Sequence, residues 1–530
     1  MTAMPQTTAP PATGGAWSPF RQSAFTVLWV ATVVSNIGTW MNDVGAGWLM
    51  TSLAPSPQIV AMVQAATTLP VFLFAIIAGA VADIVDRRKL LLVVNVALAI
   101  VAFVVAAVVQ AGAMTPVLLL IFTFLLGSGA AFIAPAWQAI VPKLVPRQDL
   151  TAAVALNSMG INISRAIGPA VAGMLIAAFG LVWPFALNAV STLIVIAALI
   201  WWKPQAEPAR KLPAEHVVGA MIAGVRYAVF TRPLRLVLVR AAGFFLFASA
   251  FWAMLPLVAR DVLGGGAGLY GALLASVGIG AVGGALVLPG LRKRLGPDRT
   301  VMLGTAGTTV VLVVLALVPG QALALLAGLI AGASWIAVLS SLNVAAQSAL
   351  PDWVRARGLA IYLTVFSGAM SLGSLGWGTI ATQTSVPVAL LVAATGILVA
   401  VPLTLWARLG GTAQDHSPAH HWPEPEAAPE DQPATIWITY DVPAEHYAAF
   451  IALMQDQRRS RRAHGAFGWV LRQDASRPTR LIESWHEASW LAHLRHHDRV
   501  THSEKALQDR IRALLSTAPE IHHSTAPRKV

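Results

Sequence analysis

Long apolar runs separated by short polar segments make up most of this chain. Because a helix needs about 20 apolar residues to cross the hydrocarbon core of a bilayer, runs of this length predict transmembrane helices. Residues of capping type, Ser56, Thr115, Asp149 and Asp352, precede four of them. The pattern predicts an all-α polytopic membrane protein with twelve spans, near residues 24–50, 57–82, 90–110, 116–140, 151–178, 181–201, 236–260, 267–290, 300–318, 321–346, 354–380 and 387–407.

The composition agrees with a membrane protein. Of the 530 residues, 56% are hydrophobic and 11% are charged, whereas soluble domains average about 25% charged residues. Cysteine is absent, which excludes disulfides and thiolate metal sites. The first residues lack the basic and apolar regions of a signal peptide, so we expect residues 1–22 to form a flexible cytoplasmic tail.

Basic residues gather in alternate loops between the apolar runs. The opposite loops hold only Arg260. By the positive-inside rule the basic side is cytoplasmic, and so are both termini. The part before residue 410 holds 22 of the 36 Lys and Arg residues but 9 of the 24 acidic ones. The net charge of +12 therefore reflects membrane topology and does not favour a nucleic-acid partner.

The apolar part contains an internal repeat with an offset of about 205 residues, as in the parallel repeats of transporters. The matching pairs are Gly79 and Gly284, Arg87-Arg88-Lys89 and Arg292-Lys293-Arg294, Pro146 and Pro351, Ala155 and Ala360, Gly168 and Gly373, and Gly173 and Gly378. We expect two six-helix bundles, 23–202 and 236–408, joined by a cytoplasmic loop at 203–235. Two such halves can rock around a central site, which is a transporter's architecture.

The loop after the second apolar run carries a recognisable motif. Gly79, Asp83, Asp86, Arg87 and Arg88 resemble the signature loop of the major facilitator superfamily. This resemblance implies a cytoplasmic gate in which Asp83 bonds across the two halves. The alternative is a basic anchor that only fixes topology.

The fifth apolar run carries a second motif. Gly160, Gly168, Pro169 and Gly173 resemble the pattern of superfamily exporters that exchange substrate for protons. The glycines by themselves indicate only close helix packing. The segment SNIGTWMNDVGAGW, beginning at Ser35, is most similar to the enterobactin-exporter-like branch.

Polar side chains inside two predicted spans are candidates for a transport pathway. Spacing of i, i+4 and i+7 places each set on one helix face: Asn36, Trp40 and Asp43, and Ser158, Asn162 and Arg165. At 1.5 Å per residue, Asp43 lies about 28 Å and Arg165 about 21 Å from the cytoplasmic helix ends, which allows an ion pair or a shared cavity.

A charge at such depth usually faces a cavity or a partner. Asp43 would carry the proton, and Arg165 would bind an anionic substrate or tune Asp43. The alternatives are a structural ion pair, or a solvated Asp43 near the outer interface. We expect Arg240 to reach the cytoplasmic surface.

The remainder of the chain has a different pattern. Residues 409–433 read as a Pro- and acid-rich linker. Residues 434–530 predict strands at 435–442, 466–472, 480–486 and 520–524 and helices at 445–455, 489–497 and 503–515, an α+β ferredoxin-like domain. It resembles the dimeric α+β barrels of the antibiotic-biosynthesis monooxygenase type, which implies dimerisation.

Two histidines of this tail have metal-ligand spacing. His493 and His497 are i, i+4 on a predicted helix, but the sequence places no third ligand beside them. Solvated surface histidines are the commoner case, so we predict no metal and no other cofactor.

The function expected from these observations is secondary transport. The chain shows no nucleophile–base pair and no phosphate-binding glycine loop, so ATP-driven transport lacks support. We expect a proton-coupled exporter of a small amphipathic molecule, drug-like or siderophore-like, in a bacterial cytoplasmic membrane. The alternatives are an importer of the same fold, a membrane-tethered monooxygenase-like enzyme, and a regulator whose tail binds a ligand.

Overall fold

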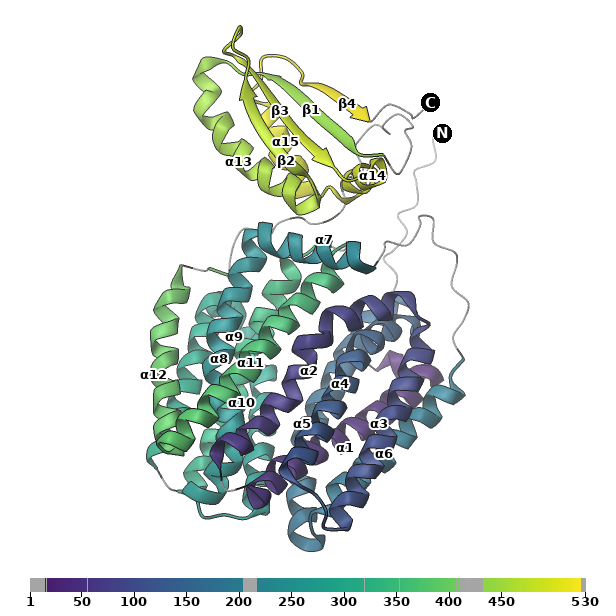
Figure 1. Ribbon diagram of the computed structural model, residues 1–530, viewed down its shortest axis with the longest axis vertical. Coiled ribbons are helices and arrows are strands. Elements are labelled where there is room, and N and C mark those ends of the chain that lie inside the picture. Colours follow the sequence, from purple (N-terminus) through teal and green to yellow (C-terminus); the bar gives the residue numbers. More distant parts are fainter. Residues whose placement is uncertain are drawn as a thin grey trace, which may run out of the picture. The chain divides into compact units, whose positions relative to one another are not determined.

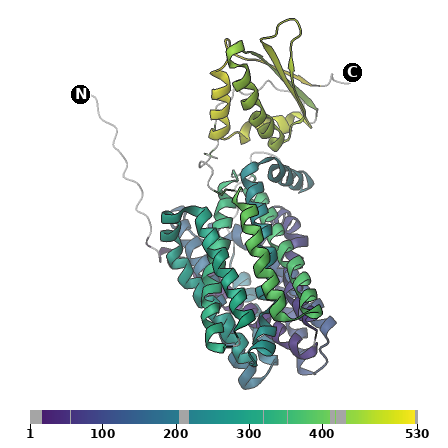
Figure 2. The ribbon, with the colours of Figure 1, turned by 90° about the vertical axis from the view of Figure 1, so that its left-hand side faces the viewer.

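The computed structural model describes residues 17–54, 56–203, 217–318, 320–351, 353–406 and 432–525, with isolated positions beside them (Figures 1 and 2). Most of the expected N-terminal tail and linker, part of the loop between the bundles, and Asp352 lie outside the described residues. The chain divides into two compact units. One comprises Met1–Leu212, Ala241–Ser341 and Leu363–Trp406, and the other Pro213–Arg240, Leu342–Tyr362 and Ala407–Val530.

The membrane part consists of long apolar helices, as predicted. They are α1 (Ser23–Leu53), α2 (Pro57–Ile84), α3 (Arg87–Gln110), α4 (Pro116–Ile140), α5 (Leu150–Phe179), α6 (Val182–Trp201), α8 (Arg232–Leu257), α9 (Ala267–Leu317), α10 (Gln321–Ser348), α11 (Arg355–Gln383) and α12 (Val386–Leu405). Figure 1 shows α1–α6 and α8–α12 as two bundles side by side.

The number of spans follows from a break in α9. Ten described helices are long and apolar enough to cross a membrane. One of them is α9, whose 51 residues are interrupted at Gly296, with φ 76° and ψ 168°, just before Pro297. Because a positive φ followed by proline ends a helix, α9 contains two spans. With the 20 residues of α12 the total is twelve, which confirms the prediction.

Three of the four expected residues, Ser56, Thr115 and Asp149, occupy the N-cap position of a helix, but only Thr115 makes a side-chain cap there. Thr115 caps α4 by accepting a hydrogen bond from the backbone N–H of Leu118 at 3.3 Å. Ser56 is the N-cap residue of α2, but its side chain makes no cap hydrogen bond, and its hydroxyl lies 3.5 Å from that of Thr382 on α11. Asp149 is the N-cap residue of α5, but its carboxylate accepts from the Ser18 hydroxyl at 2.5 Å instead of from a backbone N–H of the helix. The fourth residue, Asp352, lies outside the described residues; Asp86, which the sequence suggested only as part of the loop motif, caps α3.

The tail forms the predicted ferredoxin-like domain. Its elements are β1 (Ala434–Asp441), α13 (Tyr447–His464), β2 (Phe467–Gln473), β3 (Arg480–Glu487), α14 (Trp490–Arg499), α15 (His502–Arg512) and β4 (Glu520–Thr525). The sheet is antiparallel with order β2-β3-β1-β4. Figure 2 shows helices on one face of it. Alternate residues of β1 are buried, and Phe450 and Met454 of α13 pack into the same core.

The second unit also contains a short helix, α7 (Val217–Phe230), and residues 342–362. The hydroxyl of Tyr227 donates to the Ala349 carbonyl at 3.3 Å. The Trp353 ring stacks on His464 of α13 at 5.3 Å, and the guanidinium of Arg499 lies 4.4 Å from the Trp353 ring centre. Within this unit, the segment between α10 and α11 therefore packs against α13 and α14.

Candidate functional site

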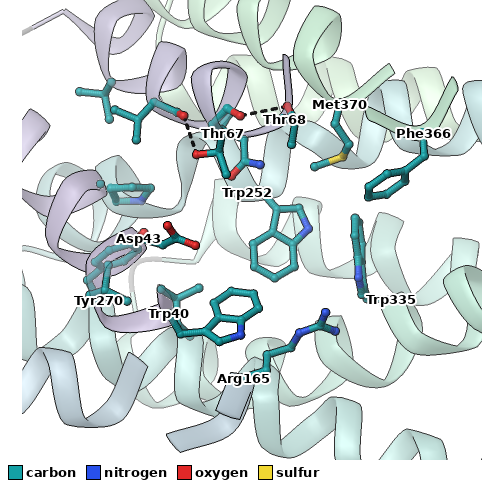
Figure 3. A pocket seen from close by; sticks show the side chains of 18 residues that line it. Trp40, Asp43, Thr67, Thr68, Arg165, Trp252, Tyr270, Trp335, Phe366 and Met370 are labelled. Atoms are coloured by element: carbon teal, nitrogen blue, oxygen red, sulfur yellow. Dashed lines mark hydrogen bonds between the residues drawn. The ribbon is translucent and has the colours of Figure 1, made fainter. Parts of the chain in front are cut away.

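A cavity of about 210 Å³ lies between the two bundles, lined by α1, α2, α5 and α8–α11 (Figure 3). Its wall is largely aromatic, since Trp40, Trp252, Tyr270, Trp335 and Phe366 all line it. The first bundle supplies Trp40, and the second bundle supplies the other four rings. Both halves of the repeat therefore build one site.

Asp43 reaches this cavity from α1 and is half-buried. Figure 3 shows its carboxylate beside Tyr270 of α9 and close to Trp40. A carboxylate in a mostly apolar wall has few groups to stabilise its charge. Its protonation therefore depends on what else enters the cavity.

Arg165 reaches the same cavity from α5. Its guanidinium carbon lies 5.3 Å from the centre of the Trp40 ring, within cation–π distance. Its Nε is buried and has no hydrogen-bond partner, and among the described residues no carboxylate forms an ion pair with it. In Figure 3, Trp40 and Trp252 lie between Arg165 and Asp43. The two charges thus share a cavity without forming a pair.

Hydroxyl groups near the cavity join the two bundles. The hydroxyls of Thr68 on α2 and Ser371 on α11 are 2.7 Å apart. Further along the same pair of helices, the backbone N–H of Gln58 donates to the Thr382 hydroxyl at 3.0 Å. These bonds hold the bundles together from the cavity to the ends of the helices at the α1–α2 connection.

Only some of the residues picked from helical spacing lie on the cavity. Trp40, Asp43 and Arg165 line it, whereas Asn36, Ser158 and Asn162 do not. The polar groups of the last two bond within α5: the Asn162 amide donates to the Ser158 carbonyl at 2.9 Å, and the Ser158 hydroxyl to the Val154 carbonyl at 3.1 Å.

The sequence missed the cavity residues of the second bundle. Trp252, Tyr270, Trp335 and Phe366 belong to uniformly apolar helices. In such helices an aromatic residue that lines a cavity has no pattern to separate it from one that faces lipid. The repeat offset indicates only that the second bundle should contribute.

The motif glycines of α5 permit close helix packing. A Cβ at Gly160 would lie 2.7 Å from the Val33 side chain, and one at Gly168 would lie 2.5 Å from the Trp40 side chain, both on α1. A Cβ at Gly173 would lie 2.9 Å from a backbone atom of Gly271 on α9. Two of these glycines therefore bring α5 against α1, and the third brings it against the second bundle. Pro169 is accommodated within the same helix.

The motif loop between α2 and α3 joins three helix ends of the first bundle. Asp86 caps α3 by accepting from the backbone N–H of Lys89 at 2.9 Å. The guanidinium of Arg88 donates to the Leu199 and Ile200 carbonyls at the end of α6, each at 2.8 Å. Arg87 donates to the Ala82 carbonyl at 3.3 Å. The side chain of Asp83 lies outside the described residues, and a Cβ at Gly79 would meet open space.

Arg240 differs from expectation. Its side chain is 4% exposed, so it does not reach the surface. The reason is that α8 is enclosed by its neighbours, so most of its residues are buried.

Known proteins share this sequence pattern and fold. The staphyloferrin A transporter of Staphylococcus aureus is 25% identical over 267 residues, which are 49% of this chain and 65% of that protein. This chain therefore covers just under two thirds of that relative. The enterobactin exporter EntS of Shigella boydii is 26% identical over 323 residues, 60% of this chain and 75% of the exporter.

Solved structures agree on the fold. A bacterial homologue of the human lysosomal transporter Spinster, inward-facing and unoccupied, matches with a TM-score of 0.57 and 13% identity, over 73% of this chain and 97% of that one. A POT family transporter in complex with 5-aminolevulinic acid matches with a TM-score of 0.59 and 13% identity, over 73% and 96% of the two chains. The profile of the transmembrane secretion effector family matches residues 14–529. The chain therefore belongs to the transmembrane secretion effector family, within the major facilitator superfamily.

Proposed function

We propose that this protein is a proton-coupled exporter of a small, siderophore-like molecule in the bacterial cytoplasmic membrane. The observation that carries the proposal is a shared aromatic cavity between two bundles, on which Asp43 and Arg165 lie without pairing. The names of the relatives, a staphyloferrin A transporter and an enterobactin exporter, support the substrate class. Family membership supports a transporter rather than an enzyme.

The cavity chemistry suits a molecule with flat apolar groups and an anionic oxygen. Trp40, Trp252 and Trp335 offer ring faces for stacking, and Arg165 offers unpaired donors. The volume of about 210 Å³ is smaller than that of pockets for drug-sized ligands, about 300–1,000 Å³. Substrate binding therefore requires a wider form, as alternating access of the two bundles would provide.

Asp43 is the proposed proton carrier. It is the acidic residue on the cavity wall, so a proton and a substrate can both reach it. In the form open to the outside, Asp43 takes up a proton. In the form open to the cytoplasm it releases that proton. The substrate then enters a cavity whose wall carries the charged carboxylate of Asp43 and the guanidinium of Arg165.

The contacts between the bundles support a form closed on the outer side. Thr68, Gln58 and Gly173 make these contacts toward the ends of α2 and α5 that are remote from the basic loops. We propose that the basic loops and both termini are cytoplasmic.

We also propose that Asp83 belongs to a cytoplasmic gate with Gly79, Asp86, Arg87 and Arg88. Asp83→Asn should then slow transport while membrane insertion is unchanged; an inverted α2–α3 loop in a cysteine-accessibility assay would support the anchor interpretation instead.

The tail is proposed to fold as an independent domain, residues 434–530, and to dimerise through its sheet. The half-exposed face of β1, with Trp437, and the exposed Phe467 on the same face of the sheet support this assembly. Light scattering of the isolated fragment measures its mass. A monodisperse monomer would contradict dimerisation.

Transport in oriented vesicles tests the main proposal. Inverted vesicles with an acidic lumen should accumulate an added iron-free siderophore, because the proton gradient then drives export into the lumen. Vesicles carrying Asp43→Asn protein at equal density are the matched control and should show no accumulation above the gradient-free level. Accumulation restricted to right-side-out vesicles would identify an importer.

A further inference from the structure

Three histidines meet at one end of the tail domain. His493 and His497 are one turn apart on α14, and His523 comes from β4. One ring nitrogen from each lies within 4.8 Å of the other two. The Nε2 atoms of His493 and His497 are 3.0 Å apart. Two nitrogens bound to one tetrahedral zinc ion, at about 2.0–2.1 Å, are about 3.4 Å from each other. Small side-chain rotations therefore suffice to place all three nitrogens around one ion.

The backbone holds these rings in place. Helix α14 begins at a cap, where the Ser489 hydroxyl accepts from the Ala492 N–H at 3.1 Å. Strand β4 pairs with β1 so that His523 lies opposite Ile436, whose side chain is in the core. His523 is thus on the helix side of the sheet, facing α14, while its neighbour His522 stacks on Trp437 on the other side, 5.6 Å between ring centres.

The carboxylate of Glu487 lies near His493, on the side of the ring that carries Nδ1. Glu487 Oε1 lies 3.6 Å from Nδ1 of the buried His493. The same oxygen accepts from Trp485 Nε1 at 3.1 Å and lies 2.7 Å from His496 Nδ1, which fixes its position. A carboxylate facing Nδ1 favours the proton there and leaves the lone pair on Nε2, toward the other two histidines. At 3.6 Å the contact is longer than a hydrogen bond; a slight shift of the ring would give the carboxylate–histidine arrangement that orients and strengthens a metal-binding imidazole.

We propose that His493, His497 and His523 form a binding site for a divalent transition-metal ion of the zinc type. Three imidazoles suit zinc and its neighbours better than hard cations, which prefer oxygen. Because His523 is exposed, a fourth coordination position opens to solvent and can take water or an outside ligand. The proposal concerns the tail alone and does not depend on the transported substrate.

Cobalt(II) is a suitable probe, because its visible absorption becomes intense in tetrahedral sites and zinc then displaces it. The full chain, purified in detergent with a tag that contains no histidine and freed of metal with a chelator, is titrated with cobalt chloride. We expect intense absorption that saturates at one ion per chain and disappears when zinc is added.

The variants separate this site from other histidines of the chain. His523→Gln changes an exposed side chain, so folding is preserved, and we expect at least a tenfold loss of affinity with loss of the tetrahedral spectrum. His497→Gln should behave alike. His522→Gln, the adjacent position on the opposite face, should bind as the unchanged protein does. Equal binding by the unchanged protein and His523→Gln, or the absence of saturable binding at one equivalent, would overturn the proposal.

Discussion

The membrane cavity and the core of the tail domain bury charged side chains in opposite ways. In the cavity, Arg165 has a buried Nε without a hydrogen-bond partner, and Asp43 shares the space without pairing with it. In the tail, Glu483 is fully buried and accepts from the Tyr440 hydroxyl and from Trp469 Nε1, both at 2.7 Å. The cavity leaves its charged side chains without an ion-pair partner, whereas the core of the tail supplies hydrogen-bond donors to its buried carboxylate.

Glu504, which is half-buried, is satisfied by hydrogen bonds in the same way as Glu483. Glu504 accepts from the Ser460 hydroxyl at 2.6 Å and from the backbone N–H of Thr501 at 2.9 Å, and lies 2.8 Å from His464 Nε2. A buried charge costs free energy unless its partners compensate. The satisfied carboxylates therefore contribute to the stability of the tail, whereas two charged side chains that line one cavity without pairing are consistent with a role in binding and proton transfer.

Asp43→Asn should have the largest effect. The amide keeps the size of the carboxyl group but cannot lose a proton, so expression and insertion should be normal while uphill efflux falls to the passive level. The measurement is siderophore efflux from proteoliposomes under an imposed pH gradient.

Asp261→Asn is the control for Asp43→Asn. Asp261 pairs with the neighbouring Arg260 outside the cavity, with 43% of its side chain exposed. That variant should keep proton-driven efflux. Full efflux by Asp43→Asn would leave Asp43 as a structural residue and remove the contrast between the two regions.

Arg165→Gln should weaken binding of an anionic substrate. A hydrogen bond to a charged group contributes about 1.5–3 kcal/mol, so affinity should fall about ten- to hundredfold. Arg165→Lys keeps the charge but loses the flat guanidinium that lies over Trp40, so an intermediate loss is expected. Equilibrium dialysis of the detergent-purified protein measures both. Equal affinity in all three proteins would show that Arg165 serves packing alone.

The sequence predicted the elements well because their signals are local. Apolar length marks each span, and the proline after Gly296 marks the break between two of them. In the tail, the alternation of β1 and the helical spacing of α13 predicted both elements, although α13 continues to His464, nine residues beyond the expected end at 455. Phe450 rather than Ile451 completes the core, a choice that local spacing leaves open because both residues fit the helical pattern.

The site was only partly predictable because it depends on contacts between distant segments. Spacing puts Asn162 and Arg165 on one face of α5, but only packing decides that Arg165 meets the cavity and Asn162 bonds to its own helix. Likewise, His493 was expected to be solvated, yet it is 2% exposed. The register of β4 against β1 brings His523 next to His493, and this register cannot be predicted from the sequence of either strand alone.

Glu483→Gln should lower the stability of the tail. The amide oxygen of the variant can accept from only one of the Tyr440 and Trp469 donors; its NH₂ faces the other and leaves a buried donor unsatisfied, at a cost of about 1–3 kcal/mol. Thermal unfolding of residues 434–530, or the rate of tail proteolysis in the full chain, measures the loss. The exposed Glu445→Gln is the control and should change neither. An unchanged melting temperature in Glu483→Gln would show that the buried network contributes little.

Acidification should have the smallest effect, and Glu504 gives its sign. Burial raises the pKa of Glu504, but the charge of His464 and the hydrogen bonds from His464, Ser460 and the Thr501 backbone outweigh it and hold the pKa well below its usual range. The folded tail therefore binds fewer protons at this group than the unfolded chain does. The stabilisation is present above the ordinary carboxyl pKa of about 4.3 and is lost as the pH falls below it, by at most about 1.4 kcal/mol per pH unit.

The Glu504→Gln variant should be less stable at neutral pH, and its stability should depend less on pH below pH ~4.3. Asp456→Asn, at an exposed position, should follow the unchanged domain. The measurement is a set of melting curves, across this pH range, for the unchanged tail domain and for its Glu504→Gln and Asp456→Asn variants. Equal losses of stability on acidification in all three would show that another group causes the acid sensitivity.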